Sequence, residues 1–230
     1  MAIFPEPAKE IIKAPFSRAD RVEYDARPFR EESKYMLREQ DMDVAGLLLR
    51  HGALSLSQIA ALTGRECRRL KDRLAALTRM GFIWRAALFD GGRRLPYIYI
   101  TGDGSARLFN TSPDKPAPVR LLNLVMASQV YLKFLENGME GKLEVRPGER
   151  KVLTITRGEK SYAVIGVRDL PGEPERAADE ISNAVRLGER VIAVMSPFVR
   201  YSFPRHEMIR YVLDNNLVEM VFDKCFRKAL

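Results

Sequence analysis

The sequence predicts a mixed α/β protein made of two domains, and three observations lead to this prediction. The chain has 230 residues, which is enough for two domains of ordinary size. Hydrophobic residues make up 46% and charged residues 30% of it, as in folded proteins with a buried core. Helical and strand-like patterns alternate, and a proline-rich stretch at residues 110–118 separates them into two sets.

These patterns divide the chain into an arm over residues 1–40, a first domain over 41–110, a linker over 111–120 and a second domain over 121–230. The arm shows no sustained apolar period, contains four prolines and carries eight basic and eight acidic residues. We therefore expect it to be extended, with one short helix near Glu31–Arg38.

The first domain opens with a helical pattern that Asp41 or Asp43 can cap and that ends at Gly52. Its apolar residues fall on one face and are expected to be buried. They are Val44, Leu47 and Leu48. Leu54-Ser55-Leu56 is then expected to be a short connector.

Two further helices are predicted after this connector. Ser57 caps the first of them, and Gly64 ends it because a tight turn needs a residue that tolerates a positive φ. The other runs from about Arg65 to Met80 and ends at Gly81. Its buried stripe is Leu70, Leu74 and Leu77.

A hairpin pattern follows the third helix. Phe82–Phe89 and Leu95–Ile100 are strand-like runs, and Asp90-Gly91-Gly92-Arg93-Arg94 between them supplies turn residues. Two short helices followed by a hairpin are the order of a winged helix-turn-helix, so we expect this fold for the first domain. Thr101 is expected to cap a short helix that runs through Phe109.

Positive charge gathers in the third helix and the hairpin. The net charge of the chain is +8 and its pI is about 9.6. Residues 57–96 hold nine basic and three acidic residues, a net charge of +6 in this window alone. This distribution favours a polyanionic partner.

The expected partner is duplex DNA. In a helix-turn-helix the second helix of the motif lies in the major groove, with its N-terminal residues facing the base edges. Arginine pairs with guanine or with phosphate, and serine hydroxyls at a helix start suit phosphate contacts. The expected DNA-binding residues are Ser55, Ser57, Arg65, Arg68, Arg69, Arg73, Arg93 and Arg94.

A protein-binding function of the same domain stays open. A basic helix face is also typical of a solvated surface, and winged helices also serve as protein-interaction modules. Glu66 and Asp72 are the only acidic residues of the third helix, so its outward face stays positive, which favours DNA. Trp84 and Tyr97 are expected to pack the wing rather than stack on bases.

The second domain begins with an apolar helix, Leu121–Glu136, which can either join the domains or form the seam of a homodimer. The βββ-α-β-α-β order that follows predicts a small mixed sheet, on which a protein partner can dock. The elements are Lys142–Val145, Val152–Thr156, Ser161–Val167, the helix Glu175–Leu187, Val191–Met195, the helix Arg205–Asn215 and Leu217–Phe222.

The first domain also resembles a known family. Leu47–Phe109 is similar to the N-terminal winged helix of the replication-relaxation family, found on bacterial plasmids and integrative elements. The resemblance rests on Leu54–Ala60, Arg68-Arg69-Leu70 with Leu74 and Leu77, Gly81-Phe82-Ile83 and Pro96–Thr101, about a quarter of the chain. It implies a role in plasmid replication or DNA topology.

The same resemblance implies a restriction-endonuclease-like fold for the second domain. Such nucleases hold Mg²⁺ with an Asp on one strand and an Asp/Glu-x-Lys on the next. Here Ile165 and Val167 stand where the acid and the lysine would fall. We therefore expect a degenerate scaffold without nuclease chemistry. Glu144, Glu149 and Asp169 leave open a metal-dependent nuclease with displaced carboxylates.

No other catalytic or metal-binding pattern occurs, so no cofactor and no metal site are expected. His51 is expected to cap a helix or lie on the surface, and His206 to lie on the surface. Cys67 and Cys225 are expected to be reduced and structural. The chain lacks a long apolar run and a signal-peptide pattern, so we expect a cytoplasmic protein without a membrane partner.

Together these patterns predict a non-catalytic duplex DNA-binding protein. Its expected role is transcriptional regulation or replication of a plasmid or mobile element. The alternatives are an adaptor that docks proteins on the winged helix and the nuclease described above. The run from Arg200 to Arg205 mixes basic and aromatic residues, so it could bind nucleic acid or a partner, and a structured loop is the expected interpretation.

Overall fold

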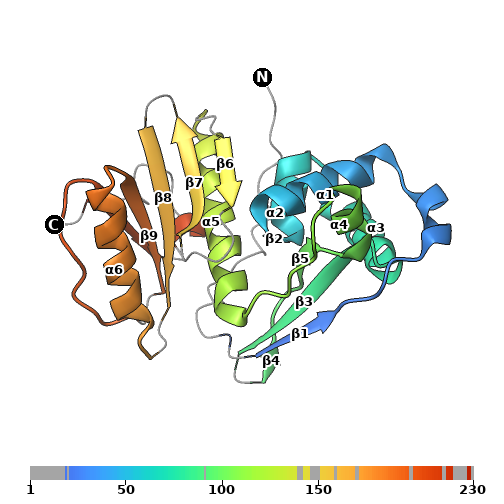
Figure 1. Cartoon of the computed structure of the whole chain (residues 1–230), viewed down its shortest axis with the longest axis horizontal. Helices are drawn as coiled ribbons and strands as arrows, with labels where there is room; N and C mark the ends of the chain where they lie inside the picture. The colour runs from blue at the N-terminus through green and yellow to red at the C-terminus, as the bar shows by residue number, and fades with distance from the viewer. Residues whose placement is uncertain are drawn as a thin grey trace. The chain divides into compact units, whose positions relative to one another are not determined.

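The computed structural model describes residues 19, 21–90, 92–138, 142–145, 151–157, 160–168, 171–196, 199–213, 216–219 and 227–228. The protein is mixed α/β, as predicted (Figure 1). Among the described residues, those up to Leu121 form one compact unit, unit 1, and those from Leu122 on form another, unit 2. No helix of this described part is long and apolar enough to cross a membrane.

The sheet of unit 1 is antiparallel and carries the hairpin predicted as a wing. Its strands lie in the order β1-β3-β5-β2, and β4 pairs with the far end of β3. The strands are β1 (Arg21–Asp25), β2 (Ala53–Ser55), β3 (Ile83–Asp90), β4 (Arg93–Arg94) and β5 (Ile98–Thr101).

Four α-helices and one 3₁₀-helix accompany these strands within the described part of unit 1. They are η2 (Glu31–Met36), α1 (Glu39–His51), α2 (Leu56–Thr63), α3 (Cys67–Arg79) and α4 (Asp103–Leu108). The order α1-β2-α2-α3-β3-β5 is that of a winged helix-turn-helix, so this prediction is confirmed.

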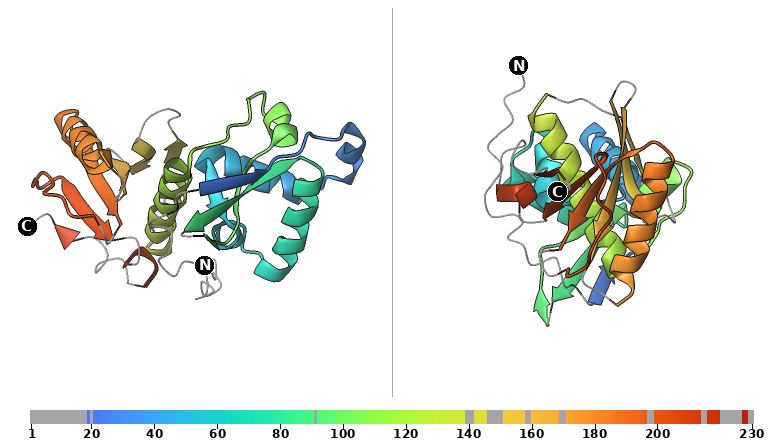
Figure 2. Two further views of the ribbon diagram at one scale, coloured as in Figure 1. Left: turned by 90° about the horizontal axis from the view of Figure 1, so that it is seen from below. Right: turned by 90° about the vertical axis from the view of Figure 1, so that its left-hand side faces the viewer.

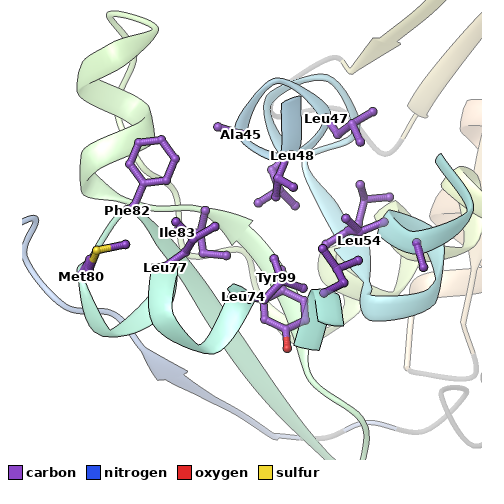
Figure 3. Packing of buried hydrophobic residues seen from close by; sticks show 14 residues of the cluster. Ala45, Leu47, Leu48, Leu54, Leu74, Leu77, Met80, Phe82, Ile83 and Tyr99 are labelled. Atoms are coloured by element: carbon purple, nitrogen blue, oxygen red, sulfur yellow. The ribbon is translucent and has the colours of Figure 1, made fainter. Parts of the chain in front are cut away.

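One hydrophobic cluster joins the three helices to the sheet. Leu48 from α1, Leu74 and Leu77 from α3 and Ile83 from β3 are fully buried in it (Figure 3). The residues predicted to face the core of α1 and α3 all do so. Because α3 buries one stripe here, its opposite face is left to solvent.

The starts of several helices differ from the predictions. α1 begins at Glu39, and the Asp41 carboxylate accepts a hydrogen bond from the backbone N–H of Arg38 at 2.7 Å, so Asp41 is inside the first turn. Ser55, not Ser57, caps α2, because its hydroxyl accepts the N–H of Gln58 while the Gln58 side chain accepts the N–H of Ser55.

The start of α3 and the end of β5 also differ from the predicted positions. α3 begins at Cys67, after Arg65, and Thr101 is the last residue of β5 rather than a cap. Gly102 is the residue that precedes α4.

The arm is not simply extended from residue 21 onward. β1 pairs with β3 from Arg21 to Asp25, and the predicted short helix is the 3₁₀-helix η2. The N–H of Arg30 donates to the carbonyl of Met80, and Gly81 lies against the backbone of Pro28, where a Cβ would be 2.3 Å from the carbonyl oxygen. The rest of the predicted arm, residues 1–18 and residue 20, is outside the described residues.

The predicted linker packs on unit 1. Residues 111–117 have no regular structure, as expected. The hydroxyl of Tyr24 donates to the carbonyl of Pro116, and the ammonium of Lys115 lies 5.2 Å from the centre of the Trp84 ring. These contacts fix the linker up to the start of the next helix.

Unit 2 is a mixed sheet with helices on both faces. The strand order is β11-β10-β9-β8-β7-β6, and β8, β9 and β10 run parallel. In Figure 2, α6 lies against one face of this sheet. The elements are α5 (Pro118–Glu136), β6 (Lys142–Val145), β7 (Lys151–Arg157), β8 (Lys160–Val167), α6 (Glu173–Arg186), β9 (Arg190–Met195), β10 (Ile209–Leu213), α7 (Asn216–Glu219) and β11 (Arg227–Lys228).

The side chains on the two faces of β8 contact different helices, α6 on one face and α5 on the other. Ile165 and Val167 are fully buried in the cluster that α6 covers. On the other face Tyr162 makes an edge contact with Phe134 of α5, at 5.5 Å between ring centres. A Cβ on Gly166 would lie 2.1 Å from the amide oxygen of Asn123, so this strand position requires glycine.

The C-terminal elements differ most from the predictions. The predicted helix Arg205–Asn215 is wrong, because β10 occupies its second half and pairs in parallel with β9. The first three residues of the predicted last strand, Leu217–Phe222, are helical instead, since α7 covers positions 216–219, and the other three are outside the described residues. Ile209 and Val212 are both buried although residues three apart lie on opposite faces of a strand, as expected for a parallel strand with both faces covered.

Candidate nucleic-acid interface

The third helix, α3, carries a continuous charged face. Leu70, Leu74 and Leu77 point into the core, and the opposite side of the helix is exposed. The exposed residues along it are Arg68, Arg69, Lys71, Asp72 and Arg79. Four of these five side chains are cationic, so the outward face of α3 is positive, as the sequence predicts.

The cations in the first turns of α3 are exposed, and at most one of them is paired within the described residues. Arg68 and Lys71 have no ion-pair or hydrogen-bond partner within the described residues. Arg69 is 88% exposed and lies 3.4 Å from the carboxylate of Glu66. An ion pair of this exposure contributes little, so a phosphate or a base edge can replace it.

Lys71 is absent from the predicted binding residues, although it shares the exposed face with Arg68. The sequence could have predicted this position, because residues three apart in a helix lie on the same side. The structure therefore adds Lys71 to the candidate interface.

Arg73 has a different role from the one predicted. Its Nε donates to Asp41 at 2.8 Å, and its Nη2 donates both to Asp41 and to the carbonyl of Met36, the latter at 2.9 Å. The hydrogen bond to Asp41 raises the pKa of Arg73. The Asp41 side chain is only 2% exposed, so this pair holds α3 to α1 and η2, and we remove Arg73 from the interface.

Arg65 is partly engaged in the same region. It precedes α3, and its guanidinium donates to the carbonyl of Gln40 and to Asp43, both at 3.3 Å. Its side chain is 28% exposed. These long contacts orient the guanidinium without burying it, so Arg65 stays at the edge of the interface.

The two predicted serines serve the fold of α2. Ser55 is buried as the N-cap, and its hydroxyl lies 2.9 Å from that of Ser57. Ser57 is half-buried beside it. Ser55 therefore has no surface to offer a phosphate, whereas Ser57 keeps part of its own.

The arginines of the wing are exposed, and one of them, Arg94, packs on the ring of Tyr97. Arg93 and Arg94 form β4 and are exposed. The Arg94 guanidinium donates to the hydroxyl of Tyr97 at 3.0 Å and lies over that ring, while Arg85 covers the ring at 4.4 Å from its centre. Arg85 is in turn paired with Asp25 of β1 at 3.0 Å. Tyr97 thus orders the wing, as predicted.

Trp84 also belongs to the fold. Its indole N–H donates to the carbonyl of Arg27 at 2.9 Å. This hydrogen bond fastens β3 to the segment after β1, and it agrees with the packing role expected from the sequence.

Nothing in the described part of unit 2 assembles the nuclease site considered above. Ile165 and Val167 are in the apolar core. Glu144 is on β6, but its side chain is outside the described set, as are Glu149 and Asp169 entirely. Groups of three or more His, Cys, Asp or Glu that could hold a metal ion do not occur among the described residues.

The histidines and cysteines divide between confirmed and corrected predictions. His51 is 2% exposed at the end of α1, so the surface position that the sequence left open is wrong, and the cap role stays a prediction. Burial, with the neighbouring Arg50 charge, lowers the pKa of His51 to about 3. His206 is exposed, and its Nδ1 accepts the N–H of Met208 at 3.2 Å. Cys67 is a free thiol, and Cys225 is outside the described residues.

Comparison with known proteins does not place the chain in a family. No family model matches it, and no curated protein matches it in sequence. The resemblance to the replication-relaxation family therefore rests on the residues quoted above.

Proposed function

We propose that this chain is a duplex DNA-binding protein in which α3 lies in the major groove and the wing contacts the backbone. One observation carries the proposal: Arg68, Arg69 and Lys71 form an exposed cationic face, on which the described residues make one exposed ion pair, between Arg69 and Glu66. Such a face at the start of the second helix of a helix-turn-helix is where base edges are contacted. Arg93 and Arg94 at the wing supply a second cationic contact.

The role that we propose for this binding is transcriptional regulation or replication of a plasmid or mobile element. It is supported by the resemblance of Leu47–Phe109 to the replication-relaxation family. We assign no catalysis to unit 2, because Ile165 and Val167 fill core positions where that family's fold would hold an acid and a lysine.

A protein-docking adaptor is the second candidate, and a separate observation favours it. Tyr35 is 94% and Met36 63% exposed on η2. The carbonyl of Met36 is held by Arg73, so these two side chains project from a fixed segment next to α3. Large apolar side chains at such a place can anchor a partner.

The test is the affinity of the full chain for random-sequence duplex DNA, measured by fluorescence anisotropy across a salt series. Affinity should fall steeply between about 50 mM and 200 mM salt, because lysine and arginine side chains that bind the phosphates release counterions from the DNA. The double variant Arg68→Ala/Arg69→Ala should bind at least about tenfold more weakly and show a salt slope smaller by up to about two.

The matched control is Arg176→Ala/Arg186→Ala, which removes the same charge from exposed positions of α6. It should retain the affinity and slope of the parent chain. Equal losses in both double variants would mean that only net charge matters, and absence of duplex binding at low salt would favour the adaptor.

A further inference from the structure

The connection between β9 and β10 is unusual for two parallel strands. A parallel crossover normally takes a helix, yet residues 199–208, which we call the aromatic strap, have neither helix nor strand. Tyr201 makes an edge contact with Phe203 at 4.8 Å between ring centres, and Phe203 contacts Tyr211 of β10 at 5.8 Å. Two rings of the strap and one of β10 thus form a row of contacting aromatic side chains.

The strap is fixed to the sheet. Phe203 and Tyr211 pack against the core that α6 covers. The hydroxyl of Tyr211 donates to the carbonyl of Pro204 at 2.6 Å, and burial raises the pKa of Tyr211 to about 12, so the donor stays protonated. Arg210 donates to the carbonyl of Glu207 at 2.7 Å and to that of Ile209 at 2.9 Å. The exposed residues of the strap therefore project from an ordered base.

The outer surface of the strap is cationic around one open ring. Tyr201 is 39% exposed, and Arg200 and Arg205 are exposed on either side of it in sequence. Neither arginine has an ion-pair or hydrogen-bond partner in the part of the chain that is described. Residues 199–211 hold three arginines against one acidic residue, Glu207.

We propose that the strap binds single-stranded nucleic acid, with an unpaired base stacked on Tyr201 and the adjoining phosphates on Arg200 and Arg205. An exposed aromatic ring, with exposed arginines one residue before it and four residues after it in sequence, offers both contacts that such strands need, stacking and charge. In a duplex the bases are stacked on one another, so a ring in this position has no base to contact. The strap belongs to unit 2 and α3 to unit 1, and the inference does not rest on the proposed duplex binding.

The experiment measures binding of labelled oligothymidine and oligouridine of about 15 nucleotides to the full chain by fluorescence anisotropy. Tyr201→Ala should weaken binding by about fivefold or more, as loss of one stacked base does, and Tyr201→Phe should retain it. Tyr201→Leu keeps apolar area without a π-face and should behave like the alanine variant. Arg200→Ala/Arg205→Ala should weaken binding and reduce its salt dependence.

The controls keep this inference apart from the proposed function. Arg176→Ala/Arg186→Ala should retain single-strand binding, and Arg68→Ala/Arg69→Ala should weaken duplex binding while it retains single-strand binding. Far-ultraviolet circular dichroism checks that each variant is folded. A response to both oligomers or to one alone supports the site and identifies the strand it prefers. A parent chain that binds neither, or binding that Tyr201→Ala leaves unchanged, overturns the inference whatever happens with duplex DNA.

Discussion

Replacing Arg73 with methionine is expected to lower the free energy of unfolding of unit 1 by about 3 kcal/mol. The change removes the partner of Asp41, whose side chain is 2% exposed, and so leaves a buried carboxylate without its main compensating charge. It also removes the hydrogen bond to the carbonyl of Met36. Methionine keeps much of the apolar stem, so the loss comes from the ion pair rather than from a cavity.

Urea denaturation followed by Trp84 fluorescence measures this effect, because Trp84 is the only tryptophan and belongs to unit 1. Arg68→Met is the matched control, since it makes the same substitution at an exposed position of the same helix. It should change stability by no more than about 0.5 kcal/mol. The double variant Arg73→Met/Asp41→Asn should recover part of the loss, because no charge is then left buried. Equal stability of Arg73→Met and the parent chain would refute the structural role of Arg73.

Acidification is expected to destabilise unit 1 through His51. Its pKa is about 3 in the folded protein, because burial disfavours the charged ring, against about 6.5 in an unfolded chain. Between these values the unfolded chain binds a proton that the folded chain does not, so stability falls as pH falls through this window. The loss approaches about 1.4 kcal/mol per pH unit and amounts to about 2 kcal/mol at pH 5.

The comparison that isolates this residue is His51→Gln, which keeps a polar side chain that does not titrate. Urea midpoints followed by Trp84 fluorescence at about pH 7 and about pH 5 should differ less in the variant than in the parent chain. A pH dependence that is the same in both proteins would show that His51 is not the group responsible.

The sequence predicts the winged helix well because its signals are local. Leu70, Leu74 and Leu77 recur at helical spacing, and the glycines and charged residues between β3 and β5 mark the hairpin. The N-cap of α2 could also have been predicted correctly from the sequence. Ser55 is followed three residues later by Gln58, the spacing of a capping box, which distinguishes it from Ser57.

Contacts between distant residues explain what sequence reasoning missed. Arg73 is next to the buried stripe of α3, and only Asp41, 32 residues away, decides that it turns inward. The burial of His51 likewise depends on packing around the end of α1 and not on its neighbours in sequence.

Contacts between distant residues also explain why the segment 205–215 was predicted as a helix although it contains strand β10. The apolar residues of 205–215 are Met208, Ile209, Tyr211, Val212 and Leu213, and this short run fits a buried strand as well as a helix. Pairing of Ile209–Leu213 with β9, which is set by the whole sheet, decides in favour of a strand. The strap before it is shaped by the contact of Phe203 with Tyr211.

The central claim, that α3 reads duplex DNA in the major groove, is tested most directly by methylation interference. Duplexes selected from a random pool by the full chain are methylated at guanine N7, a major-groove atom that arginine contacts, and are then divided into bound and free fractions. We expect methylation of specific guanines to block binding by the parent chain and to have no effect on residual binding by Arg68→Ala/Arg69→Ala. Selected duplexes that bind equally well when any guanine is methylated would contradict placement of these arginines in the major groove.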